Sequence, residues 1–119
     1  MLEESVELIL TLPKTISLNK LYSSSHWTVR KKEKDAYTKI IKKELDRFDH
    51  YRGELMSIDV RYNSRYDVDN FIVVPKFVAD TLVADGWIAD DSPKYYKSLR
   101  IRYDESIEKN LCQVRVTLT

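Results

Sequence analysis

The hydrophobic and polar positions of the chain follow two different periods. Apolar and polar residues alternate in four short stretches, and a period of two is typical of a β-strand with one buried face. These stretches lie at positions 6–12, 56–62, 99–103 and 111–118. Pro13 ends the first stretch, and the segment DESIEKN between the last two favours an antiparallel hairpin. The alternation therefore predicts four strands.

Two segments between these strands carry apolar residues at helical spacing. The first begins near Thr28, and its apolar positions are Tyr37, Ile40, Ile41, Leu45 and Phe48. We expect the second helix to begin near Val74, after a bridging turn at 71–73, because Pro75 is tolerated in a first helical turn. Its apolar stripe consists of Val74, Phe77, Val78, Thr81 and Leu82. Gly86 is the expected end of this helix.

This order of elements predicts an α+β fold, a small mixed four-stranded sheet with two helices packed on it. The 119 residues suffice for one hydrophobic core, and no repeat or composition shift marks a boundary, so we expect a single domain over residues 1–119. Cys112 is the only cysteine, which excludes a disulfide or a Cys-based zinc site within one chain. No apolar run reaches the length of a membrane span and the start MLEES is unlike a signal peptide. We therefore expect a cytoplasmic protein without a membrane partner.

The formal net charge of +1 hides a segregation of charge along the chain. Residues 14–47 hold ten Lys/Arg against four acids, whereas residues 54–91 hold three Lys/Arg against eight acids. The basic segment fits a solvated helix face or a phosphate-binding surface equally well. The acidic segment repels phosphate unless bound metal ions reverse its sign.

Two pairs of aspartates are the strongest candidates for a chemical role. Asp67 and Asp69 lie in RYDVDN after the second strand, and Asp90 and Asp91 follow Gly86. Carboxylates at i and i+2 of an extended segment point the same way, and such crowding is costly without a cation. If the chain after Gly86 returns along the sheet, we expect Asp91 to approach Asp67 and Asp69. Oxygen ligands of this kind suit Mg²⁺ or Mn²⁺.

The same residues also fit ordinary turn chemistry. Asp-x-Asp-Asn before a helix matches N-capping and Asx-turns, and Asp-Asp before Ser-Pro is a common loop composition. Spacing alone therefore leaves a metal site and a set of capping residues as alternatives. Neither His26 nor His50 has a partner at zinc-ligand spacing, which disfavours zinc.

Several sequence elements, taken in order, resemble the signature of the RusA-type Holliday junction resolvases, which are crossover junction endodeoxyribonucleases. These elements are RYDVDN, Lys76, Asp80, Gly86 and the pair Asp90–Asp91. The opening strand ending in LP, the polar loop with Asn19 and the basic helix are also similar to the N-terminal half of that family. The interval from Asp69 to Gly86 is longer than in well-known members, and Pro75 lies within it.

The resemblance implies a RusA-like fold and a Mg²⁺-dependent endodeoxyribonuclease, with Mn²⁺ as a substitute ion and no organic cofactor. A homodimer would resolve four-way DNA junctions by paired symmetric nicks, in recombination and repair. Small resolvases of this type often belong to phages or mobile elements. The metal-binding and catalytic positions fall on Asp67, Asp69 and Asp91, with the neighbouring Asp90 as a further ligand or a group that supports the ligands. Lys76 matches the family's catalytic basic residue near the scissile phosphate.

The resemblance also assigns supporting roles. Asn70 would orient the turn and its carboxylates, and Asp80 would hold the helix or pair with a basic residue. The expected DNA contacts are Arg65, Lys76, Lys20, Arg30, Lys31 and Lys32.

Three other functions remain open from the sequence. A relaxed metal-dependent nuclease for flaps, forks or other branched DNA would use the same residues. A structure-selective DNA-binding protein would keep the fold and lack cleavage. A protein-interaction domain would use the aspartates as capping residues only.

Overall fold

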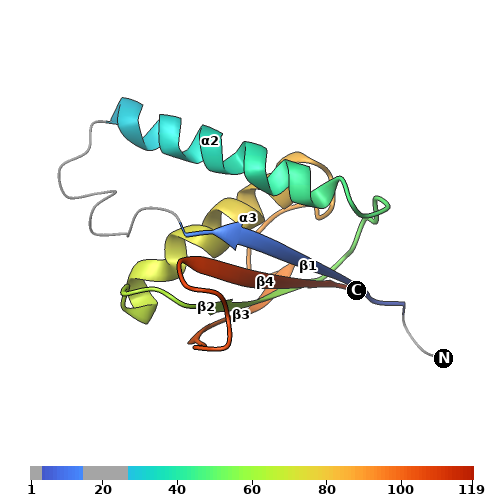
Figure 1. Ribbon diagram of the computed structural model, residues 1–119. Helices are drawn as coiled ribbons and strands as arrows, with labels where there is room; N and C mark the ends of the chain where they lie inside the picture. Colours follow the sequence, from blue (N-terminus) through green and yellow to red (C-terminus); the bar gives the residue numbers. More distant parts are fainter. Residues whose placement is uncertain (1–3, 15–26) are drawn as a thin grey trace.

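The computed structural model describes residues 4–14 and 27–119, and Figure 1 shows how their elements are arranged. Along the chain these are β1 (Val6–Pro13), α2 (Trp27–Leu45), β2 (Met56–Tyr62), the 3₁₀ helix η1 (Val68–Ile72), α3 (Val73–Ala84), β3 (Tyr96–Tyr103) and β4 (Leu111–Leu118). The described residues form a four-stranded sheet with two α-helices, so the predicted α+β fold is confirmed.

The strands form one mixed sheet in the order β1-β4-β2-β3. β4 is antiparallel to both β1 and β2, whereas β3 is parallel to β2. Parallel neighbours need a long crossover connection, which η1 and α3 supply between β2 and β3. Both helices lie on one side of the sheet (Figure 1). The other face carries no helix from the described part of the chain.

The antiparallel hairpin predicted between the last two strands is wrong, because β2 lies between β3 and β4. The connecting residues 104–110 cross the end of β2 instead, and Asn63 holds this crossing. Its backbone N–H donates to the Leu111 carbonyl at 3.2 Å, and its carbonyl accepts from the Asn110 N–H at 2.6 Å. Its side-chain amide donates to the Ile107 carbonyl at 2.8 Å.

Alternate residues of β1, β2 and β4 point toward the helices and form the core. These inward residues are Leu8, Leu10, Leu12, Met56, Ile58, Val60, Tyr62, Cys112, Val114, Val116 and Leu118. Burial raises the pKa of the Cys112 thiol to about 12. A neutral, buried thiol agrees with a structural role for this cysteine.

The first helix buries a narrower stripe than its sequence predicted. Tyr37, Ile41 and Leu45 are buried as expected, but Ile40 is 38% exposed and Phe48 lies beyond the end of α2. α2 covers β1 and α3 only along one side, because its lysines occupy the rest of its circumference.

None of the helices in the described residues is long and apolar enough to cross a membrane.

The second helix agrees closely with its predicted bounds. A longer and earlier turn, η1 (68–72), replaces the bridging turn predicted at 71–73, and α3 begins at Val73, one residue before the predicted start. Every residue of the predicted apolar stripe is buried. Gly86 ends this unit with a left-handed φ of 78°, which only glycine adopts without strain. Trp87 and Ile88, which are 4% and 1% exposed, then anchor the loop in the core.

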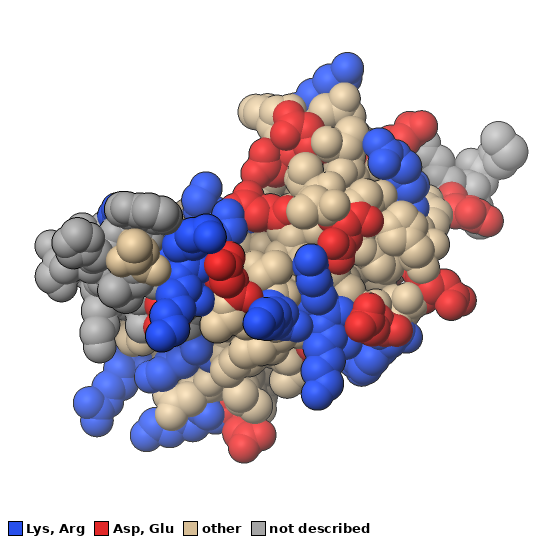
Figure 2. Space-filling model, turned by 90° about the horizontal axis from the view of Figure 1, so that it is seen from above, with Lys and Arg blue, Asp and Glu red and all other residues tan. Residues whose placement is uncertain are grey.

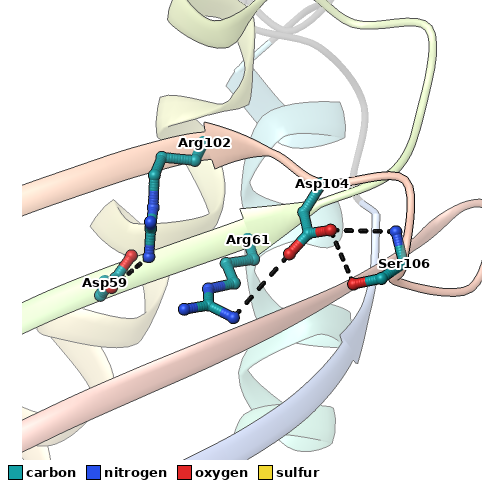
Figure 3. A network of polar contacts seen from close by, with 5 residues as sticks. All are labelled: Asp59, Arg61, Arg102, Asp104 and Ser106. Atoms are coloured by element: carbon teal, nitrogen blue, oxygen red, sulfur yellow. Dashed lines mark hydrogen bonds and ion pairs between the residues drawn. The ribbon is translucent and has the colours of Figure 1, made fainter.

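Ion pairs on the helix-free face join β3 to β2 (Figure 3). Arg102 donates to Asp59 at 2.9 Å, and Arg61 lies 3.8 Å from Asp104. Hydrogen bonds from Ser106, aided by Arg61, hold the pKa of the Asp104 carboxyl below its usual value. These contacts fix the parallel strand at the edge of the sheet.

The central position of β2 in the sheet gives a test of the packing. We expect Ile58→Ala, at a site 2% exposed, to lower the free energy of unfolding by about 2–5 kcal/mol, because it leaves a cavity in the core. Ile72→Ala, at a site 40% exposed, is the matched control and should cost less than about 1 kcal/mol. Urea unfolding followed by circular dichroism measures both. Equal losses would contradict the described core.

Candidate functional site

The first aspartate pair lies in the loop that leaves the end of β2. Asp67 has an extended backbone (φ −64°, ψ 155°) and immediately precedes η1, which contains Asp69. The Asp67 carbonyl accepts a hydrogen bond from the Asn70 N–H at 3.0 Å, but the Asp67 carboxylate makes no capping hydrogen bond. Both carboxylates are exposed. Asp67 therefore occupies an N-cap position without acting as a side-chain cap.

Aromatic side chains support this loop from below. The ring of Tyr62, the last residue of β2, stacks on Phe71 with centroids 4.1 Å apart and an interplanar angle of 12°. The Tyr62 hydroxyl donates to the Tyr66 carbonyl at 2.9 Å. Burial raises the pKa of Tyr62, and the negative charges of Asp67 and Asp69 raise it further. These rings were not among the predicted site residues, although the aromatic residues on both sides of the aspartate pair were a signal for such a support.

The second aspartate pair lies in the loop that enters β3. Asp90 and Asp91 are exposed, and they follow the anchored residues Trp87 and Ile88. Ser92, the next residue, accepts hydrogen bonds from the backbone N–H groups of the residues that lead into β3. Burial raises the pKa of Tyr96 to about 12, with the charge of Asp91 as the second cause. Asp91 is thus electrostatically coupled to the first residue of β3.

The structure places the two pairs at opposite ends of the β2–β3 unit. The first residue of β3 pairs with Met56 at the start of β2, and the last, Tyr103, pairs with Tyr62 at its end. Six residue steps along β2 separate the two ends by about 20 Å. The expectation that Asp91 approaches Asp67 and Asp69 is therefore wrong within one chain. Because β3 is parallel to β2, the crossover must bring the chain back to the end where β2 begins.

Within one chain the aspartates do not fit a divalent metal ion as a single set of ligands. Among the described residues, no group of three or more His, Cys, Asp or Glu side chains is placed to hold a metal. The four aspartates also form no hydrogen bond or ion pair through their carboxylates in that part of the chain. Among residues 4–14 and 27–119 they remain two exposed pairs of carboxylates that offer oxygen ligands.

The basic residue predicted at the catalytic centre lies at the start of α3, the helix that follows the first pair. Lys76 is exposed in the first turns of α3, four residues after Ile72 and therefore on the same exposed face of the helix. Arg65 is exposed in the bend that precedes Asp67. The structure thus brings two cations to the same loop and helix start as Asp67 and Asp69.

The two supporting residues occupy different environments. Asn70 lies in η1, where its backbone closes the turn that begins at Asp67. Asp80 lies on α3 and accepts a hydrogen bond from the Lys34 ammonium on α2 at 2.9 Å. This contact confirms the expectation that Asp80 pairs with a basic residue, and it joins the two helices.

The remaining predicted DNA contacts lie mainly on α2. Arg30 is half-buried, and Lys31 and Lys32 are exposed, with Lys31 3.9 Å from Asp35. Lys20 lies outside the described residues. Figure 2 shows Lys and Arg side chains along the upper face of the molecule, with acidic side chains between them. The positive charge of α2 therefore forms an exposed face, away from the sheet.

No protein-family model matches the chain, and a search of curated proteins finds no match.

The separation of the two pairs can be tested through the tyrosines beside them. In an Asp67→Asn/Asp69→Asn variant we expect a lower pKa of Tyr62 and an unchanged pKa of Tyr96, because carboxylate charge disfavours the phenolate. The matched Asp90→Asn/Asp91→Asn variant should lower the pKa of Tyr96 and leave the pKa of Tyr62 unchanged. NMR titration of ¹³C-labelled tyrosine measures both groups. If both variants changed the pKa of the same tyrosine, the placement of the two aspartate pairs at opposite ends of the β2–β3 unit would be contradicted.

Proposed function

We propose that this protein is a divalent-metal-dependent endodeoxyribonuclease that cuts branched DNA, most specifically four-way junctions, as a homodimer. The main support for the proposal is the exposed Asp67–Asp69 pair. The Asp67 carboxylate makes no capping hydrogen bond, and the exposed cations Arg65 and Lys76 flank the pair along the chain. Crowded carboxylates next to cations favour a site where a metal ion and a phosphate meet. The ordered likeness to the RusA-type signature supports the same chemistry.

The homodimer explains how separated aspartates serve one site. A two-fold axis perpendicular to β2 and β3 would turn the second copy end for end, and it would set the Asp90–Asp91 end of one copy beside the Asp67–Asp69 end of the other. Each dimer then has two equivalent acidic sites, each built from two chains. Two equivalent sites match the two symmetric cuts that a four-way junction requires.

The roles of the side chains follow from the chemistry of a phosphodiester. A bound Mg²⁺ or Mn²⁺ would activate water and neutralise charge at phosphorus. Asp67 and Asp69 from one copy, with Asp91 from the other, supply oxygen ligands of the type these ions prefer. Lys76 and Arg65 stabilise the charge of the phosphate by hydrogen bonding. The lysines of α2 contribute sequence-independent attraction to the DNA backbone.

The first functional test removes one carboxylate. We expect Asp69→Asn to lower the rate of Mg²⁺-dependent cleavage of a synthetic four-way junction by more than about 100-fold. Loss of a metal ligand should cost more activity than loss of a group that only orients the ligands. Asp80→Asn is the control, since Asp80 pairs with Lys34 and should change cleavage less than about threefold. Gel assays with labelled strands measure the rates. Full activity of Asp69→Asn would sink the proposed function.

The second functional test asks whether one site uses two chains. Neither Asp69→Asn nor Asp91→Asn should cleave alone. Mixed dimers of the two variants regain one intact site, because the wild-type Asp69 and Asp91 then meet across the axis. Random pairing should restore about one quarter of the wild-type sites in a two-fold dimer. The product should be a junction with a single nick. No recovery after subunit exchange would contradict a shared site.

A structure-selective DNA-binding protein without cleavage is the second candidate. Two observations favour it. The aspartates of one chain are divided into two pairs that do not form a metal site among the described residues, and α2 presents exposed basic side chains. Junction binding that is equal with and without Mg²⁺, and no nicking by the wild-type chain, would support this candidate.

A further inference from the structure

Arginines gather on the helix-free face of the sheet. On β4, β2 and the part of β3 that pairs with β2, the residues that alternate with the core positions point to this face. Among these outward positions, all in the described part of the chain, Asp59 is the one carboxylate and no lysine occurs, while Asp104 follows directly after β3. The outward cations, here called the arginine face, are Arg61, Arg100, Arg102 and Arg115.

The pairing of the strands sets two of these arginines on either side of one aspartate. Arg115 on β4 and Arg100 on β3 are both direct neighbours of Asp59 on β2. Since adjacent strands lie about 4.8 Å apart, the backbones of the two arginines are about 10 Å apart. The next row holds Arg61 beside Arg102. The arginine face therefore consists of two short rows that cross the sheet.

Two of the four arginines have partners within the chain, and two do not. Arg102 and Arg61 each lie within ion-pair distance of an aspartate (Figure 3). The side chains of Arg100 and Arg115, in contrast, form no hydrogen bond or ion pair within residues 4–14 and 27–119. Because Arg102 already neutralises Asp59, the positive charge of the two flanking arginines is left uncompensated.

We propose that the arginine face binds an acidic segment of another protein, through ion pairs from Arg100 and Arg115 to two carboxylates of that segment. Guanidinium groups form bidentate hydrogen bonds with carboxylates, which makes arginine the cation best suited to such contacts. Acidic side chains at i and i+2 of an extended segment lie on the same side, about 7 Å apart. The long arginine side chains can close the remaining difference to their own spacing. The binding of this segment requires neither DNA nor a metal ion.

Three features of this face favour a protein over a nucleic acid. Arginine is enriched and lysine depleted at protein interfaces, whereas six of the seven cations of α2 are lysines. No aromatic side chain occupies the described outward positions of these strands, so bases have no platform on which to stack. Asp59 and Asp104 lie among the arginines, and a backbone with a phosphate at every nucleotide would meet them. A peptide can place its carboxylates opposite the arginines alone.

Peptide binding to the full chain, without metal, tests this surface. The probe is a short fluorescent peptide of alternating Glu and Thr, and its control has Gln in place of Glu. We expect Arg100→Gln/Arg115→Gln to bind the Glu–Thr peptide about tenfold or more weakly than the wild type. Lys31→Gln/Lys32→Gln removes the same charge from α2, where salt screens it from this face, and should change the affinity less than about twofold. Fluorescence anisotropy measures both affinities.

Folding of the variants is checked by circular dichroism. If the double arginine variant fails to fold, Arg100→Gln alone takes its place, because this side chain is exposed.

NMR of the arginine side chains locates the bound peptide. The Glu–Thr peptide should shift the Nε–Hε signals of Arg100 and Arg115, whereas the Gln–Thr peptide should not. Absence of binding by the Glu–Thr peptide overturns the proposal, as does an equal loss of affinity in the arginine and lysine variants. A DNA duplex that shifts these signals at a lower concentration than the peptide also overturns it, and would assign the arginine face to nucleic acid.

Discussion

The parallel pairing of β2 with β3 determines where the two aspartate pairs lie and which strand ends the sheet. It requires a crossover, which η1 and α3 provide, and it sends the chain back to the start of β2 before β3 begins. The ion pair between Asp59 and Arg102 holds the added strand in place. As a consequence, the two aspartate pairs lie at opposite ends of one unit, and β3 becomes an exposed edge of the sheet.

The periodicity of the sequence predicted most of the elements. Strand alternation located β1, β2 and β4 because one face of each is buried, and the apolar stripe of α3 is buried in full. Gly86 marked the helix end because its left-handed backbone requires glycine. Ile40 was placed inward by spacing alone, yet α2 covers too little of the core to bury it.

Strand partners could not be read from local pattern in the same way. The segment DESIEKN has a length and composition that suit a hairpin, but it crosses the end of β2, where Asn63 both donates hydrogen bonds to it and accepts one from it. The order strand, helix, strand over residues 56–103 was a signal for parallel pairing. Because the prediction of one acidic cluster depended on that pairing, the residues of the candidate site were identified but their arrangement was not.

In the proposed dimer, the second copy brings its Asp90–Asp91 pair to the Asp67–Asp69 pair of the first, and paramagnetic NMR with Mn²⁺ can detect this arrangement. A single bound Mn²⁺ broadens the signals of amides close to it. If each site draws on two chains, substoichiometric Mn²⁺ should broaden the amides of residues 67–70 and 90–92 together in the wild-type dimer. A monomeric variant should lose this joint effect. Broadening of only one of these segments in the dimer would contradict a metal site that is shared between two chains.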